Sequence, residues 1–272
     1  MTNIQTPPVD SPSPYHLLAV VLISAVAGAM NAVAGGGTLL TFPALIGLGI
    51  PPLVANATST VALWPGSAGS IWGYRGELAG ARKWAIGFAL PSLAGGLVGA
   101  LLLLATDEKT FSDLVPWLVL GATALFIAQG PLSRWLKGRV RSPMGAPDDD
   151  GTTRFPAPSL LAFQFMIGIY GGYFGAGAGI LMLAALGLMG LTNIHRMNGL
   201  KNWGGLCMNA VAAVTFSISG LVNWPVALSM AVGAAGGGYL GSRTAQRVGQ
   251  QAVRGVIVAI GLGSGIWLLF RR

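Results

Sequence analysis

Two glycine clusters interrupt the apolar stretches of this sequence and carry its strongest chemical signal. They are Ala34-Gly35-Gly36-Gly37-Thr38 and Phe174-Gly175-Ala176-Gly177-Ala178-Gly179. The apolar segments after them, residues 37–50 and 178–191, are too short to cross a bilayer at roughly 1.5 Å per residue. Half-helices of this kind begin with unpaired N–H groups and the positive end of a helix dipole, and glycine lets an anion reach that backbone. The two breaks therefore predict an anion site.

One basic residue lies near the second break. Lys201 is placed about five residues inside an apolar segment, where an unpaired charge costs several kcal/mol unless it faces an interior cavity or reaches the interface. Two interpretations stay open: Lys201 is the electrostatic anchor for an anion, or its side chain snorkels to the nearby membrane surface.

Several amides also lie at apolar depth, where each needs hydrogen-bond partners. Substrate contact and helix-to-helix hydrogen bonding both explain them. The pair Asn56 and Asn198 is distinctive because each follows a half-helix at the same distance. The set is Asn31, Asn56, Asn198, Asn202 and Asn209.

The composition indicates that the protein lies in a lipid bilayer. Of the 272 residues, 53% are hydrophobic and 9% are charged, against roughly 25% charged in soluble domains. The net charge of +8 comes from Lys and Arg in short connections, which indicates membrane topology and argues against a nucleic-acid partner. One cysteine and two histidines cannot supply an ordinary zinc site, so we expect no metal and no cofactor.

These residues must be positioned by membrane helices. The sequence predicts an all-α polytopic fold with a disordered tail over residues 1–14, transmembrane repeats over 15–130 and 158–272, and a cytoplasmic linker over 131–157. Each repeat is expected to hold a glycine-broken helix and half-helix followed by three transmembrane helices. Basic loops stay cytoplasmic, which places the loop with Arg75, Arg82 and Lys83 inside and both termini outside, although Arg271 and Arg272 oppose that rule.

The two halves are related by an ungapped shift of 142 residues. The shift superimposes Gly35 on Gly177, Asn56 on Asn198 and Gly95 on Gly237. With the topology above, the halves cross the membrane in opposite directions, an arrangement typical of secondary transporters that bind substrate near the midplane between broken helices.

The motifs AGAMNAVAGGGTLLTFPALIGLGIPPLVANATSTVALWPGS and FGAGAGILMLAALGLMG with HRMNGLKN resemble the TauE/SafE family of sulfite exporters and toluenesulfonate uptake permeases. The likeness covers nearly the whole chain. It implies transport of sulfite, sulfonates, sulfoacetate-like compounds or thiosulfate across the bacterial inner membrane. The motif positions that it marks for substrate binding are Gly35, Gly36, Gly37, Thr38, Asn56, Thr58, Ser59, Gly175, Gly177, Gly179, Asn198, Lys201 and Asn202.

We therefore expect a secondary carrier for a small sulfur-containing oxyanion. An anion channel and an uptake permease coupled to a cation are the alternatives. All eight acidic residues lie in the tail, in loops or at span ends, so coupling through a buried carboxylate lacks a residue. An enzyme built on Ser67 would need a base within reach, and the histidines, His16 and His195, lie at span ends.

Overall fold

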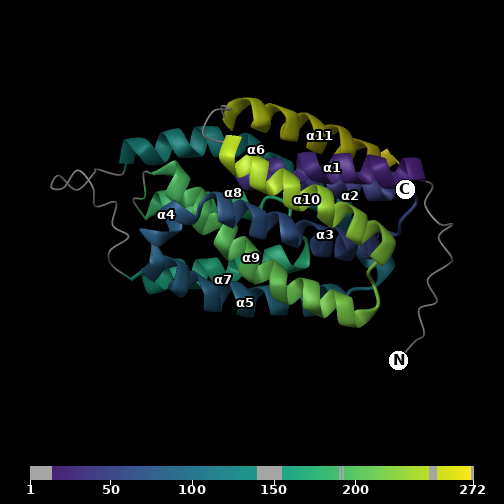
Figure 1. Cartoon of the computed structure of the whole chain (residues 1–272), viewed down its shortest axis with the longest axis horizontal. Helices are drawn as coiled ribbons and strands as arrows, with labels where there is room; N and C mark the ends of the chain where they lie inside the picture. The colour runs from purple at the N-terminus through teal and green to yellow at the C-terminus, as the bar shows by residue number, and fades with distance from the viewer. Residues whose placement is uncertain (1–13, 140–154, 190, 192, 245–249, 271–272) are drawn as a thin grey trace.

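The computed structural model describes residues 14–139, 155–189, 191, 193–244 and 250–270. Over these residues the chain forms eleven helices and no strand, which confirms the all-α prediction (Figure 1). The expected tail over 1–14 and the terminal pair Arg271 and Arg272 lie almost entirely outside the described residues, as does most of the expected linker.

The helices of the first half end beyond the predicted boundary of that repeat. The last of them continues to Arg139, nine residues past position 130. One short helix, α4, was not expected. The helices are α1 (Pro14–Val33), α2 (Gly37–Gly47), α3 (Pro52–Gly73), α4 (Arg75–Ala79), α5 (Arg82–Leu104) and α6 (Glu108–Arg139).

The helices of the second half begin at positions offset from the first. Three of them start 142 residues after α3, α5 and α6, and the half-helix α8 starts within one residue of that offset. Both half-helices, α2 and α8, have 11 residues, about 16 Å at roughly 1.5 Å per residue, half of a ~30 Å hydrocarbon core. The helices are α7 (Pro158–Tyr173), α8 (Ala178–Leu188), α9 (Ile194–Ser219), α10 (Trp224–Thr244) and α11 (Gln250–Phe270).

The two halves interlock. Helix α1 packs against α10, and its counterpart α7 packs against α5, so each half covers the first helix of the other. Helices α3 and α9 pack against each other at the centre, and each also contacts a helix of the opposite half. In Figure 1, α4 lies at one end of the bundle, and α1 begins and α11 ends at the opposite end.

Glycines allow the close helix crossings. A Cβ on Gly237 of α10 would overlap the carbonyl oxygen of Ala25 in α1, and a Cβ on Gly99 of α5 would overlap that of Ile169 in α7. Lipid supplies no hydrophobic force between helices, so small residues that bring backbones together stabilise such crossings.

The outer surface is apolar. Large exposed side chains include Leu22 on α1, Leu90 on α5, Trp117 on α6 and Val232 on α10, an apolar coat that water would not tolerate but lipid does. Among the described helices, Arg82–Leu104 and Glu108–Ala128 are long and apolar enough to cross a membrane by those criteria alone. The central helices α3 and α9 are more polar because they carry Asn, Ser and Thr side chains that the fold turns inward.

These crossings predict an asymmetric effect of two neighbouring substitutions in α10. Gly237→Ala should lower the thermal unfolding temperature of the detergent-purified protein, because its methyl group collides with the α1 backbone and overpacking costs roughly 1–3 kcal/mol. Gly236→Ala is the matched control, since a Cβ there meets nothing within 4 Å. Equal melting temperatures for the two variants would contradict this account of the crossing.

Candidate functional site

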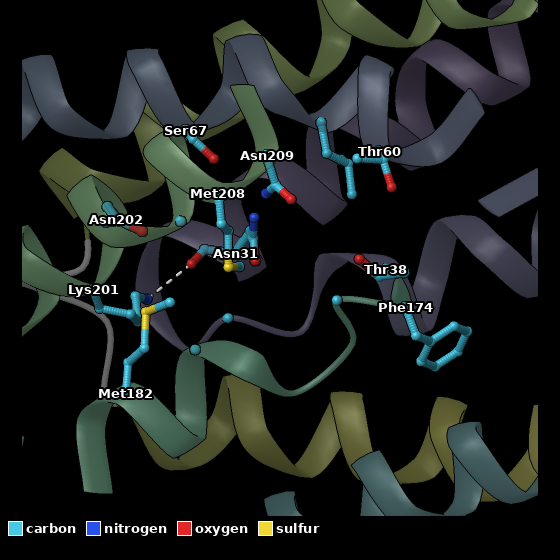
Figure 2. Close-up of a pocket in the computed structure, with 15 residues that line it drawn as sticks. Asn31, Thr38, Thr60, Ser67, Phe174, Met182, Lys201, Asn202, Met208 and Asn209 are labelled. Carbon is cyan, nitrogen blue, oxygen red and sulfur yellow. Dashed lines mark hydrogen bonds between the residues drawn. The ribbon is translucent and has the colours of Figure 1, made fainter. Parts of the chain in front are cut away.

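A cavity of about 40 Å³ lies where both glycine breaks meet α3 and α9 (Figure 2). Residues from both glycine breaks and from both central helices line it. Its lining residues are Asn31, Gly35, Thr38, Thr60, Leu63, Ser67, Phe174, Gly175, Gly179, Met182, Lys201, Asn202, Gly205, Met208 and Asn209.

The two central helices present matching faces to the cavity. Helix α3 supplies Thr60, Leu63 and Ser67, which are spaced three and four residues apart and so lie on one side of a helix. Helix α9 supplies Asn202, Gly205 and Asn209, each 142 residues later. A contact between matched positions, the Trp64 indole N–H donating to the Leu206 carbonyl at 3.2 Å, joins the same two helices. The cavity therefore lies between equivalent faces of the two halves.

The glycine breaks are left-handed turns that touch. Gly35 has φ +83° and its counterpart Gly177 has φ +82°, values that side chains rarely adopt and glycine adopts freely. A Cβ on Gly35 would lie 2.9 Å from the Gly179 Cα, so the two backbones are in contact. Thr38 and Gly179, both in the cavity lining, belong to the first turns of α2 and α8, where helix N–H groups have no intrahelical partner.

Lys201 is buried within the bundle rather than extended to its end. Its side chain is 3% exposed, and Nζ donates to the carbonyl oxygens of Asn31 at 2.9 Å and Ala32 at 3.1 Å. The Asn202 amide also donates to Ala32, at 3.2 Å. These acceptors are carbonyls in the last turn of α1, where the helix dipole is negative, so the position suits a cation. Figure 2 shows Lys201 reaching Asn31 at one side of the cavity.

The equivalent carbonyl at the end of α7 is capped by a different side chain, which the first half supplies. Tyr173, 142 residues after Asn31, ends α7, and its carbonyl accepts the Asn56 amide at 2.9 Å. Ser59, the counterpart of Lys201, instead shares a 2.6 Å hydrogen bond with the Thr41 hydroxyl. The capping of broken helices is thus common to both halves, but only the second half does it with lysine.

The residues marked from the sequence fall into two groups. Gly35, Thr38, Gly175, Gly179, Lys201 and Asn202 line the cavity. The others lie outside its lining: Asn56 caps α7 as above, Thr58 accepts the backbone N–H of Asn223 at 3.0 Å, and Asn198 is buried, with no hydrogen-bond partner for its amide oxygen in the part of the chain that the structure describes. The rest of this second group is Ser59, Gly36, Gly37 and Gly177.

The lining also contains residues that were not among the motif positions predicted to bind substrate. Most of them are apolar: Leu63, Phe174, Met182, Gly205 and Met208, together with Thr60. The sequence leaves Asn31 and Asn209 open between substrate contact and helix-to-helix hydrogen bonding, and it raises Ser67 only as the nucleophile of an alternative enzyme. One signal could have found most of those on α9 and α3: steps of three and four residues from Asn202 give Gly205 and Asn209, and the 142-residue shift then gives Thr60, Leu63 and Ser67.

The polar groups of the lining favour negative charge. They comprise the Lys201 amine, the amides of Asn31, Asn202 and Asn209, and the hydroxyls of Thr38, Thr60 and Ser67, with no carboxylate among them. The described acidic residues lie near the helix ends: Glu77 in α4, Asp107 just before α6, and Glu108 and Asp113 in the first two turns of α6. The cavity can thus offer hydrogen bonds and positive potential to an anion.

The model of the sulfite exporter TauE/SafE family matches residues 20–268. The chain belongs to that family. A probable membrane transporter protein, ORF9, of Sinorhizobium sp is 31% identical over 261 residues, 94% of this chain and 93% of the relative. The probable membrane transporter YfcA of Escherichia coli K12 is 27% identical over 95% of this chain and 91% of its own length.

Membership in the TauE/SafE family confirms the resemblance seen in the sequence. Its family and relatives are membrane transporters. The protein is therefore a multi-pass membrane transporter and not an enzyme. A more distant relative, the probable membrane transporter YunE of Bacillus subtilis, is 25% identical over 89% of this chain and 94% of its own length, so the whole helical bundle described above belongs to the transporter.

The Asn56 cap predicts a stability effect remote from the cavity. Asn56→Ala should lower the unfolding temperature of the purified protein, because a buried carbonyl at the end of α7 loses its donor, at a cost of roughly 1–3 kcal/mol. Asn209→Ala removes an amide that lines the cavity and makes no hydrogen bond within the described residues, so it should change the melting temperature less. A larger loss in Asn209→Ala than in Asn56→Ala would contradict this assignment.

Proposed function

We propose that this transporter is a secondary carrier that binds a small sulfur-containing oxyanion in the central cavity. The observation that supports it most is convergence: the first turns of α2 and α8 and the Lys201 amine meet at one cavity with no carboxylate in its lining. Helix N-termini and a buried cation attract an oxyanion, whereas a cation substrate would find no anionic ligand there.

The substrates proposed are sulfite, thiosulfate, sulfoacetate-like compounds and organosulfonates. The family name supports sulfite, and the chemistry of the cavity supports any compact oxyanion. Because amides and hydroxyls are neutral donors, they fit oxygen atoms of a sulfur oxyanion without fixing which one is bound. Thr38, Lys201 and Asn202 are the side chains proposed to contact it, with the backbone of Gly35, Gly175 and Gly179.

The carrier is proposed to work by alternating access in the bacterial inner membrane. The matched helix starts and the reciprocal packing of α1 on α10 and α7 on α5 support two repeats of opposite orientation. Arg75, Arg82 and Lys83 lie in or beside α4, and basic connections stay inside. The α4 end of the bundle is then cytoplasmic, and the termini are periplasmic because α1 begins and α11 ends at the other end.

The membrane potential suffices to drive export. An inside-negative potential favours outward movement of one negative charge by about 2.3 kcal/mol per 100 mV. With no carboxylate in the cavity lining, the mechanism proposed is facilitated or exchange transport rather than proton coupling through a buried acid. Saturable flux that external substrate accelerates would separate this carrier from an open channel.

Lys201 provides the test. In detergent, sulfite or thiosulfate should raise the melting temperature of the wild-type protein, and Lys201→Met should lose that increase because the substitution keeps the length of the side chain and removes its donors. Proteoliposome uptake of labelled sulfite should fall about tenfold or more, the change that ~1.4 kcal/mol produces.

Asn56→Ala is the matched control for this test. It removes a cap at the equivalent carbonyl in the other half without touching the cavity, so it should lower the basal melting temperature and leave the anion-induced increase intact. Full anion stabilisation in Lys201→Met, or equal loss in both variants, would overturn the role proposed for the lysine.

A further inference from the structure

The lining contains one position where the helix leaves empty space. A Cβ placed on Gly205 of α9 would have no heavy atom within 4 Å, although the residue lines the cavity. The adjacent Gly204 differs: its Cβ would lie 3.0 Å from the Gln164 amide nitrogen and 3.4 Å from the Met182 sulfur. The space at Gly205 is thus a local feature of the cavity and not a general looseness of α9.

The open turn lies between two polar side chains. Gly205 is four residues after Lys201 and four residues before Asn209, and residues four apart are neighbours on one helix face. Figure 2 shows Lys201 and Asn209 on successive parts of α9 along the cavity. An occupant above Gly205 would therefore have an amine on one side and an amide on the other.

The other half fills the matching space. Leu63 occupies the position 142 residues before Gly205 on the facing helix α3, lines the same cavity and is only 3% exposed. The free volume is consequently displaced toward α9, the helix that carries the lysine. Sequence symmetry alone would have placed it equally on both helices.

Lys201 has a donor to spare for this space. A protonated lysine has three N–H donors, and two of them are used by the carbonyls of Asn31 and Ala32. An anion beside Gly205 can take the third without removing the cap from α1.

We propose that Gly205 is the size-determining residue of the transporter: the anion sits over this open turn, between Lys201 and Asn209, and the missing side chain sets how large it can be. The inference rests on the proposed function and specifies where in the cavity the anion binds. The cavity of about 40 Å³ corresponds to roughly three water molecules at ~10–15 Å³ each. A cavity of this size narrows the proposed substrates to compact oxyanions and excludes the aromatic organosulfonates. A single added methyl group would take the place of about one water molecule.

A substitution series at Gly205 tests the proposal. Both Gly205→Ala and Gly205→Val are made in the full-length protein. Gly205→Ala should keep the basal melting temperature, because its added Cβ has no heavy atom within 4 Å. Gly205→Ala should weaken sulfite binding in a thermal-shift titration by about tenfold and thiosulfate binding by more, because thiosulfate is larger. Gly205→Val should abolish stabilisation by both, and toluenesulfonate should stabilise none of the proteins.

Gly236→Val is the matched control, since this glycine of α10 is also open but lies outside the cavity. It should bind both anions as the wild type does. Wild-type affinity in Gly205→Ala and Gly205→Val, or loss that is independent of anion size, would overturn the role of Gly205. If Gly205→Val does not fold, the sulfite-to-thiosulfate ratio in Gly205→Ala decides the question. Failure of every anion to stabilise the wild type would instead refute the proposed function.

Discussion

Two helices, α1 and α7, end inside the bundle, where lipid offers their backbone no hydrogen bonds. The last carbonyls of a helix lack intrahelical donors, and at membrane depth each unsatisfied group costs several kcal/mol. Helices α1 and α7 solve this with side chains from the opposite half: Lys201 and Asn202 serve the end of α1, and Asn56 serves the end of α7. The hydrogen bonds that satisfy the ends of the broken helices therefore also join the two halves.

The sequence predicted the parts of the molecule that leave a polar or conformational signature in an apolar background. Both breaks, both half-helices and the 142-residue correspondence of helix starts could be found because Gly35, Gly177 and Asn56 stand out in such a background. Helix α4 could not, since a five-residue helix has too few positions to show a period. Leu63 and Met182 were missed for another reason: in an apolar span the side facing the interior resembles the side facing lipid.

Lys201 shows most clearly what a single sequence leaves open. Its distance from the start of α9 permits either burial or extension to the membrane surface, because the flexible stem of lysine spans both. Which one holds depends on where the end of α1 lies, and α1 is 170 residues away in the chain. The burial of Lys201 is thus a consequence of how the halves pack, and no local pattern around the residue encodes it.

The difference between the halves also has a physical logic in terms of the proposed transport cycle. A carrier must empty and refill its site while the buried carbonyls beside it stay satisfied. The Asn56 amide has two N–H donors and an oxygen that repels anions, so it suits a permanent cap at α7, away from the cavity. The Lys201 amine has no competing acceptor when protonated, and it can hold both carbonyls of α1 with one donor left over. A lysine can therefore cap both carbonyls and still bind an anion, whereas an asparagine, with two N–H donors, would have none left after capping both.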